Sequence, residues 1–421
     1  MGPPVGVPPD AGVDAPVDPA SVVTVTVTLD GAPRQDVVVY IQSSNLGPST
    51  ELRTDAKGSA MAPLTGGFYD IGSVTVINPF GPINATTDEL LTYNGVKLGD
   101  HIAVARASRP PSVSFTVVAP SYTPAAKRYL LHTSCGAVEI APNGAHVGGA
   151  VTLQGCGSAI DTLVEALDDA GHSLSWLYNS DVAVRNGETI VLTGAYLPSG
   201  SKTFSYHTES IDRPQLEIHA RLLTAKGIVY ESPAQVIPVS YMDEYPSLTF
   251  ALPSIPGAVS VTETIYQAGD NGLEHMVEWG PDSDRYELDL EALGHSFLEE
   301  FYSVPTFVGG VITYTWHGGH LADYMRTRLS ATRAGERSWE WQFVSPPLPF
   351  GGGAQAWPVI PSNVYPYNRT AGDVWSLQDT MLVHGPGGYD AIRARALSIP
   401  DPLAQLTGPA GRLVYETVLP E

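Results

Sequence analysis

The stretch SVVTVTVTLDGAP, residues 21–33, decides the fold class of this chain. Valine occupies positions 23, 25 and 27, and threonine occupies positions 24, 26 and 28. This period-two alternation is typical of a β-strand with one buried and one solvated face. Asp30 and Gly31 then give a turn signal, and VVVYI at 37–41 predicts the returning strand.

The rest of the chain continues the β pattern. The 421 residues include 42 Gly and 36 Pro, which argues against a mostly helical protein. Strand-like runs recur at intervals of roughly ten residues, separated by Gly, Asn and Pro turns. We therefore predict an all-β protein of tandem β-sandwich domains, immunoglobulin-like or transthyretin-like, with few short helices. The best helical candidates are 295–302 and 323–333.

The first segment carries a family resemblance. The order of DGAP, VVVY, TDAKG and GGFYDI resembles the carboxypeptidase regulatory-like domains, which are transthyretin-like or Cna-B-like β-sandwiches. The residues that carry it are Gly31, Pro33, Val37, Val39, Thr54, Asp55, Gly58, Gly67 and Tyr69. Asp55 is expected to cap its own turn and Gly58 to supply a positive φ. The resemblance implies a spacer or adhesion module without catalysis of its own.

Composition shifts divide the chain into a tether and three domains. Residues 1–20 hold six Pro and three Asp, so they are expected to form a flexible, extended tether. The tether resembles those of bacterial surface lipoproteins, which implies a lipid anchor upstream; an ordinary disordered terminus is the alternative. We expect a regulatory-like β-sandwich at 21–120, an immunoglobulin-like β-sandwich at 121–244, and an aromatic-rich binding domain at 245–421.

The charge balance excludes some partners. Lys and Arg total 22 against 44 Asp and Glu, which gives a net charge of -22. This field repels phosphate backbones and anionic membrane surfaces, so we expect no nucleic-acid partner. No run of apolar residues reaches the length of a membrane span, roughly 18 or more.

The two cysteines, Cys135 and Cys156, lie between strand-like segments. An even pair at this spacing favours a disulfide and an oxidising compartment. Two buried free thiols and a metal site are the alternatives; for zinc, the pair lacks a neighbouring CxxC.

The aromatic residues of the last segment are candidates for ligand binding. It contains six of the seven Trp, and Trp339 and Trp341 share one face of a predicted strand. Exposed rings there would form a platform for a sugar or peptide; buried rings would form a core. The platform candidates are Trp316, Trp339, Trp341 and Trp357.

Metal-ligand candidates also fall in this segment. His317 and His320 are three residues apart in TWHGGH, with Asp323 three further on and His384 more distant. The alternative is a set of ordinary loop histidines, and we expect no convergence of His317, His320 and His384 on one metal. The acidic run PDSDRYELDLE, 281–291, makes Ca²⁺ the ion expected if any binds, with Arg285 opposing it.

These observations favour a non-catalytic, secreted or surface-tethered bacterial protein that presents a binding domain to an unidentified protein or polysaccharide. A carbohydrate-binding lipoprotein is one alternative. A metal-dependent hydrolase centred on His317 and His320 is the other. We expect no cofactor.

Overall fold

The computed structural model describes most of the chain between residues 19 and 418. The described residues are 19–43, 49–64, 71–106, 112–122, 126–198, 200–207, 215–238, 247–268, 272–281, 285–289, 301–308, 311–316, 322–333, 337–346, 353–356, 367, 370, 372–384, 388–394 and 410–418. The expected tether therefore lies outside them, except for Pro19 and Ala20, which begin the 3₁₀ turn η1 (Pro19–Ser21).

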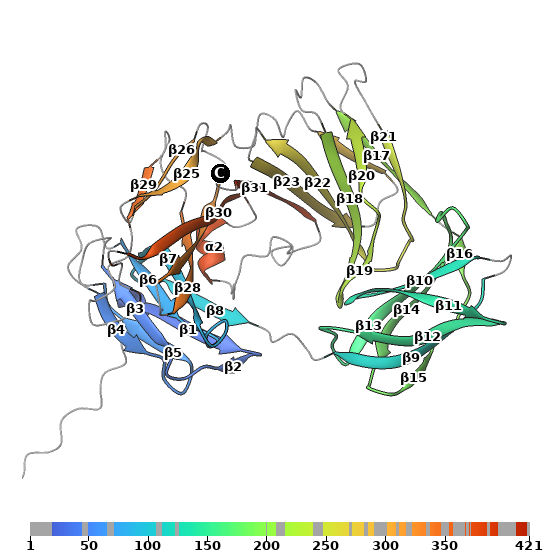
Figure 1. The fold of residues 1–421 in the computed structure, drawn as a ribbon, viewed down its shortest axis with the longest axis horizontal. Helices are drawn as coiled ribbons and strands as arrows, with labels where there is room; N and C mark the ends of the chain where they lie inside the picture. Colours follow the sequence, from blue (N-terminus) through green and yellow to red (C-terminus); the bar gives the residue numbers. More distant parts are fainter. Residues whose placement is uncertain are drawn as a thin grey trace, which may run out of the picture.

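The described residues confirm the all-β prediction (Figure 1). Beside η1, the one described helix is the short α2 (Gly388–Ala394). No described helix has both the length and the apolar character needed to cross a membrane.

The first sheet contains the alternating stretch that decided the fold class. Its order is β2 (Ala32–Pro33), β1 (Val23–Leu29), β5 (Ser59–Ala62), and β8 (His101–Arg106) pairs with β1 in parallel. Val23, Val25 and Val27 are fully buried, as the alternation predicts. Asp30 and Gly31 have φ of 55° and 74°, and they connect β1 to β2 as a two-residue turn.

The predicted turn at Asp55 is also confirmed. Its carboxylate accepts the N–H groups of Lys57 and Ser59 at 2.8 and 2.9 Å, and Gly58 has φ of 71°. A Cβ at position 58 would lie 2.5 Å from the carbonyl oxygen of Val27. Glycine is therefore required here by both conformation and space.

An eight-stranded sheet forms the second unit. Its order is β15 (Thr189–Val191), β9 (Val113–Pro120), β12 (His146–Leu153), β11 (Gly136–Asn143), β10 (Arg128–Thr133), β13 (Ala159–Leu167), β14 (Ser173–Ala183), β16 (Leu197–Pro198). The sequence placed 113–120 at the end of the first domain. Instead, β9 pairs with β12 and β15, so it lies with the second unit.

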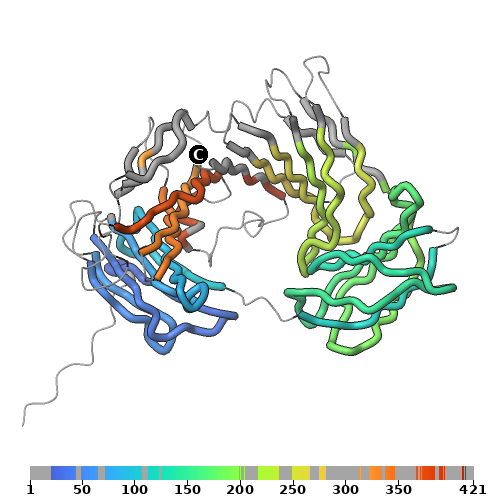
Figure 2. The backbone as a smooth tube through the Cα atoms, viewed as in Figure 1, coloured from blue at the N-terminus to red at the C-terminus, as the bar shows by residue number. Residues whose placement is uncertain are grey.

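A thirteen-stranded sheet joins distant parts of the described chain. Its order is β19 (Gly227–Glu231), β18 (Gln215–Thr224), β22 (Val259–Ala268), β23 (Gly272–Pro281), β31 (Gly411–Val418), β30 (Val374–His384), β27 (Tyr324–Thr332), β28 (Ser338–Ser345), β7 (Thr87–Lys97), β6 (Ile71–Ile77), β3 (Val38–Gln42), β4 (Ser49–Arg53). β20 (Gln235–Pro238) pairs with β18 off this path. In Figure 2 the orange and red trace of the last segment runs beside the blue and cyan trace of the first.

The two remaining sheets each have three strands. One has the order β21 (Ser247–Ala251), β17 (Ser201–His207), β24 (Arg285–Asp289). The other has the order β25 (Phe301–Val308), β26 (Val311–Trp316), β29 (Gly353–Ala356).

Two sequence expectations need correction. The sheets cross the expected domain boundaries, because β7 and β28 belong to segments 21–120 and 245–421 but pair directly and in parallel. The helix expected at 323–333 is the strand β27, and residues 301 and 302 of the other candidate belong to β25. In β27 the buried Leu329 and Ala331 alternate with less buried neighbours, a period of two rather than 3.6.

Aromatic contacts join the eight-stranded sheet to the thirteen-stranded one. Tyr230 of β19 meets the rings of Trp176 and His132 edge-on, with centroids 4.9 and 5.0 Å apart. His132 Nε2 also lies 2.8 Å from a carboxylate oxygen of the buried Glu165. Apolar burial and a satisfied polar pair therefore hold this junction.

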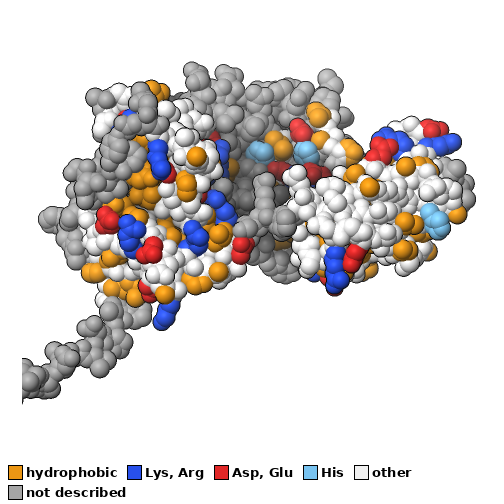
Figure 3. Space-filling view, turned by 60° about the horizontal axis from the view of Figure 1, so that its bottom comes forward, with side chains coloured by type: hydrophobic (Ala, Val, Ile, Leu, Met, Phe, Trp, Pro, Cys, Tyr) orange, Lys and Arg blue, Asp and Glu red, His pale blue; other side chains and the backbone are white. Residues whose placement is uncertain are grey.

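The surface carries charges of both signs. Among the described residues on the face drawn in Figure 3, basic and acidic side chains lie interspersed among apolar and uncharged ones.

The disulfide expected from the sequence is present. Cys135 lies in the turn between β10 and β11, Cys156 lies between β12 and β13, and their Cα atoms are 5.5 Å apart. Cys156 belongs to the core of the eight-stranded unit, and the partly buried Cys135 packs against that core.

Breaking this cross-link should loosen the second unit. With a sequence separation of 21, the chain-entropy model assigns the bond about 3 kcal/mol. In urea unfolding, a double Cys135→Ala, Cys156→Ala variant should lose about that much of its free energy of unfolding. The unmutated protein, denatured without reduction, should show no titratable thiol. Two free thiols per chain would contradict the assignment.

The tryptophans of β28 generate a second prediction. Trp341→Ala should lower the free energy of unfolding by about 3–5 kcal/mol, because the ring is 1% exposed. Val374→Ala is the control; its side chain is 68% exposed, so its effect should stay within about 0.5 kcal/mol. Equal losses for the two variants in urea unfolding would argue against a core role for Trp341.

Candidate functional site

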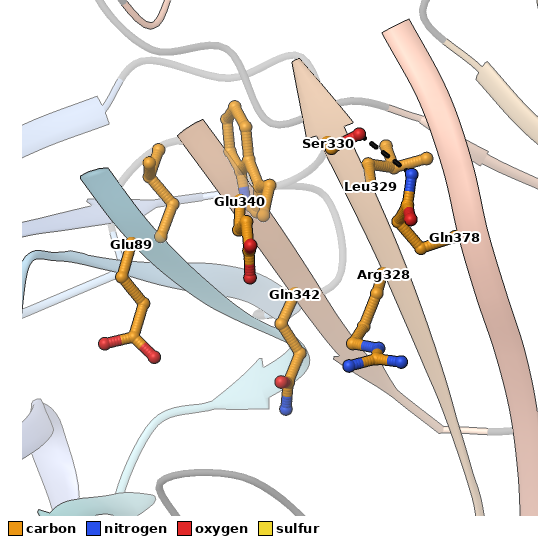
Figure 4. Close-up of a pocket in the computed structure, with 9 residues that line it drawn as sticks. Glu89, Arg328, Leu329, Ser330, Glu340, Gln342 and Gln378 are labelled. Atoms are coloured by element: carbon orange, nitrogen blue, oxygen red, sulfur yellow. Dashed lines mark hydrogen bonds between the residues drawn. The ribbon is translucent and has the colours of Figure 1, made fainter. Parts of the chain in front are cut away.

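A polar groove crosses the thirteen-stranded sheet where its first and last segments meet. It lies over four neighbouring strands, β7, β28, β27 and β30, and its cavity volume is about 150 Å³. The polar side chains that line it are Glu89, Arg328, Ser330, Glu340, Gln342 and Gln378. Figure 4 shows Glu89, Gln342 and Arg328 extending toward the same side of the sheet.

Strand register brings these residues together. Glu340 lies opposite Glu89 on one side and opposite Ser330 on the other, and Gln342 lies opposite Arg328. Directly opposed residues in neighbouring strands project from the same face of a sheet. The groove is therefore built on the face of β28 that carries Glu340 and Gln342. Leu90, Leu329 and Trp341, which stand at the alternate positions of their strands, also contribute to its lining.

Glu89 is fixed from outside its own sheet. Arg106, at the end of β8, donates a hydrogen bond to Glu89 at 2.7 Å. Burial raises the pKa of Glu89 above its ordinary value, Arg106 opposes this rise, and the neighbouring Glu340 adds to it. The result is a half-buried carboxylate beside an exposed one.

At the other end of the groove, the carboxylate of Asp379 forms ion pairs with two guanidinium groups. Arg328 Nε donates to Asp379 Oδ2 at 2.6 Å, and Arg326 donates to Asp379 Oδ1 at 3.3 Å. Asp379 and Arg326 are buried, and burial lowers the pKa of Arg326. Removing the carboxylate alone would leave two close positive charges, one of them in the interior, so this trio is first of all structural.

Amide side chains complete the lining. Gln378 Nε2 donates to the hydroxyls of Ser330 and Ser376 at 2.9 and 3.0 Å (Figure 4 draws the first bond). Gln342 Nε2 and Glu89 Oε2 are buried and have no hydrogen-bond partner among the described residues. The groove thus offers one donor and one acceptor that the described chain does not satisfy.

The predicted Trp platform is wrong for two of its members. Trp339 and Trp341 are 0% and 1% exposed and belong to an apolar core. Trp339 meets the ring of Trp375 edge-on at 5.4 Å, and Trp341 Nε1 donates to Thr92 Oγ1 at 2.8 Å. Their shared face, correctly inferred from the alternation, points into the protein, so neither ring can stack on a ligand.

The remaining predicted site residues are only partly described. Trp357, His317 and His320 lie outside the described residues, as does the side chain of Trp316. Asp323, from the metal alternative, has an oxygen 2.9 Å from His384 Nδ1. Among the described residues, no group of three or more His, Cys, Asp or Glu side chains could hold a metal ion.

Sequence reasoning missed the residues of the groove. The run SWEWQF at 338–343 places Glu340 and Gln342 between the aromatic residues, so the alternation did mark a polar face opposite the Trp residues. Glu89 carries no such signal, because its pairing with Glu340 crosses most of the chain.

A second polar cluster lies on β18, β19, β22 and β23. Glu263 contacts Arg221, and its other oxygen lies 3.0 Å from His275 Nδ1. Arg221 also binds Glu231 at 2.8 Å, and His219 Nε2 lies 2.8 Å from Glu217. Burial would raise the pKa of Glu263, but hydrogen bonds from His275 and Arg221 outweigh it and lower the pKa to about 2.

Comparisons with known proteins give no family. No protein-family model and no curated protein matches the chain. The TIE protein of Bacillus anthracis is 8% identical with a TM-score of 0.15, over 64% of this chain and 49% of that one. A tetra-tandem repeat from the extending region of a large adhesion protein is 9% identical with a TM-score of 0.13, over 87% of this chain and 95% of that one.

The major pilin protein T-13 of Streptococcus pyogenes is 7% identical with a TM-score of 0.09, over 77% of this chain and 95% of that one. This chain thus spans about half the length of the TIE protein. TM-scores this low carry no argument about function.

The ionised Glu263 should make stability depend on pH. Its pKa is near 2 in the folded protein and near 4.5 in the unfolded chain. The contribution of the ionised Glu263 to the free energy of unfolding is therefore complete above about pH 5 and is lost as the pH falls from about 4.5 to about 2. It is on the order of 3 kcal/mol.

Urea unfolding between pH 2 and pH 7 should show this loss of stability. In Glu263→Gln, the free energy of unfolding should depend less on pH over this range. Glu139→Gln is the control, because Glu139 pairs with Arg128 at an exposed position. An unchanged acid slope in Glu263→Gln would argue against this role.

Proposed function

We propose that this chain is a non-catalytic, extracytoplasmic protein that serves as a structural or adhesive module, secreted or tethered at a bacterial surface. The observation that carries the proposal is the parallel pairing of β7 with β28. It joins the first and last segments into one continuous sheet, with the polar groove lying across the join. A continuous sheet of this kind is a rigid element that can hold the shape of a binding surface.

The disulfide supports the compartment. Cys135 and Cys156 are bonded, and disulfides persist in secreted and envelope proteins but are rare in the reducing cytoplasm. The Pro- and Asp-rich stretch 1–20 supports a tether that separates the folded body from its attachment point. The mechanism is then passive: reach from the tether, rigidity from the joined sheet, and recognition at the groove.

The hydrogen bonds of the groove support binding rather than catalysis. Its guanidinium groups hold carboxylates in place, Arg106 on Glu89 and Arg328 on Asp379, and its amide Gln378 holds Ser330. Groups fixed in this way orient a bound partner and keep the shape of the groove.

Location and redox state test this proposal directly. Fractionation of the producing cells should find the chain outside the cytoplasm, and protease added to intact cells should degrade it while a cytoplasmic marker survives. Chain from those fractions should resist thiol labelling until it is reduced. Recovery of the chain from the cytoplasm with two reactive thiols would overturn the proposal.

A further inference from the structure

The charges of the groove balance. Six ionisable side chains stand in it or bind those that do, three carboxylates and three guanidiniums: Glu89, Glu340, Asp379, Arg106, Arg326 and Arg328. Their formal charges sum to zero. A site of this kind gives no net attraction to an anion such as a phosphate group, or to a divalent cation.

The hydrogen-bonding groups of the groove are mixed. Glu340 is an exposed acceptor, and the buried Glu89 Oε2 is an acceptor without a partner among the described residues. Gln342 lines the groove, and its Nε2 is a buried donor that likewise has no partner among the described residues. A ligand that satisfies both kinds must donate and accept at neighbouring atoms.

A hydroxyl group meets this requirement, because it donates one hydrogen bond and accepts others. An ammonium group only donates, and a carboxylate or phosphate only accepts. Adjacent hydroxyls on one ring would donate to Glu340 and Glu89 while accepting from Gln342. This also relieves the opposition of two carboxylates in direct register on neighbouring strands.

The size of the groove limits the ligand. Its volume of about 150 Å³ lies below the range of about 300–1,000 Å³ that is typical of sites for drug-sized molecules. One sugar-sized ring fits this volume, and the open face lets a chain continue beyond it. The buried ring of Trp341 cannot stack on the sugar, so recognition rests on hydrogen bonds.

We propose that the groove over β7, β28, β27 and β30 binds a neutral, hydroxyl-rich ligand, namely one ring of a glycan. Glu340 and Glu89 accept hydrogen bonds from its hydroxyls, and Gln342 donates to them. This inference rests on the proposed function, since it names the ligand class of the surface that the scaffold would display.

The test uses the full chain and three sets of soluble oligosaccharides on a glycan array: neutral, sulfated or carboxylated, and amino-substituted. The neutral set should give the strongest signal, confirmed by NMR titration. Glu340→Gln and Gln342→Ala should each weaken binding at least tenfold, and Glu139→Gln, in the eight-stranded unit, should leave it unchanged.

Thermal melts identify any variant that fails to fold, and Ser330→Ala then provides a further substitution in the groove. Absence of binding to every neutral glycan, preference for a charged set, or affinity unchanged in both Glu340→Gln and Gln342→Ala would overturn the inference. None of these results bears on location or redox state, so the proposed function is tested separately.

Discussion

The parallel pairing of β7 with β28 is the contact on which the rest of the architecture depends. It runs in register from Thr87 opposite Ser338 to Tyr93 opposite Val344. Backbone hydrogen bonds there join two sets of strands that would otherwise end in open edges. The same pairing places Glu89 beside Glu340, so one interaction creates both the continuous sheet and the polar groove.

The two faces of β28 show how alternation separates stability from recognition. Trp339, Trp341 and Phe343 enter the apolar core, while Glu340 and Gln342 face the groove. A large aromatic side chain in a strand stabilises the fold when its face is covered. Because the Trp residues anchor this strand, the polar residues between them are held in fixed positions, which a binding surface requires.

Local pattern predicted local structure well. The alternation of Val23, Val25 and Val27, the Asp30 turn and the Asp55 turn all follow from neighbouring residues, and the structure confirms each of them. The failures concern distant partners. A strand such as β27 was mistaken for a helix because its burial depends on β28 and β30, and β9 was assigned to the wrong unit because its partners come later in the chain.

The candidate site could not be predicted for the same reason. The Trp residues were identified as a shared face, but whether that face is covered depends on packing that no local pattern reveals. The polar residues of SWEWQF were visible in the sequence, yet their meaning depends on Glu89 and Arg106 from the first segment.

The distance along the chain between β7 and β28 also sets an order of events during biosynthesis. The hydroxyls of Thr87 and Ser338 form a hydrogen bond across 251 positions, so the two strands cannot meet until the residues between them have been made. Until then, β7 has an unpaired edge of backbone N–H and C=O groups, the kind of edge that recruits strands from other molecules. A nascent chain of this design must be shielded or kept dilute until β28 has been made, and a premature stop before β28 would release an aggregation-prone fragment.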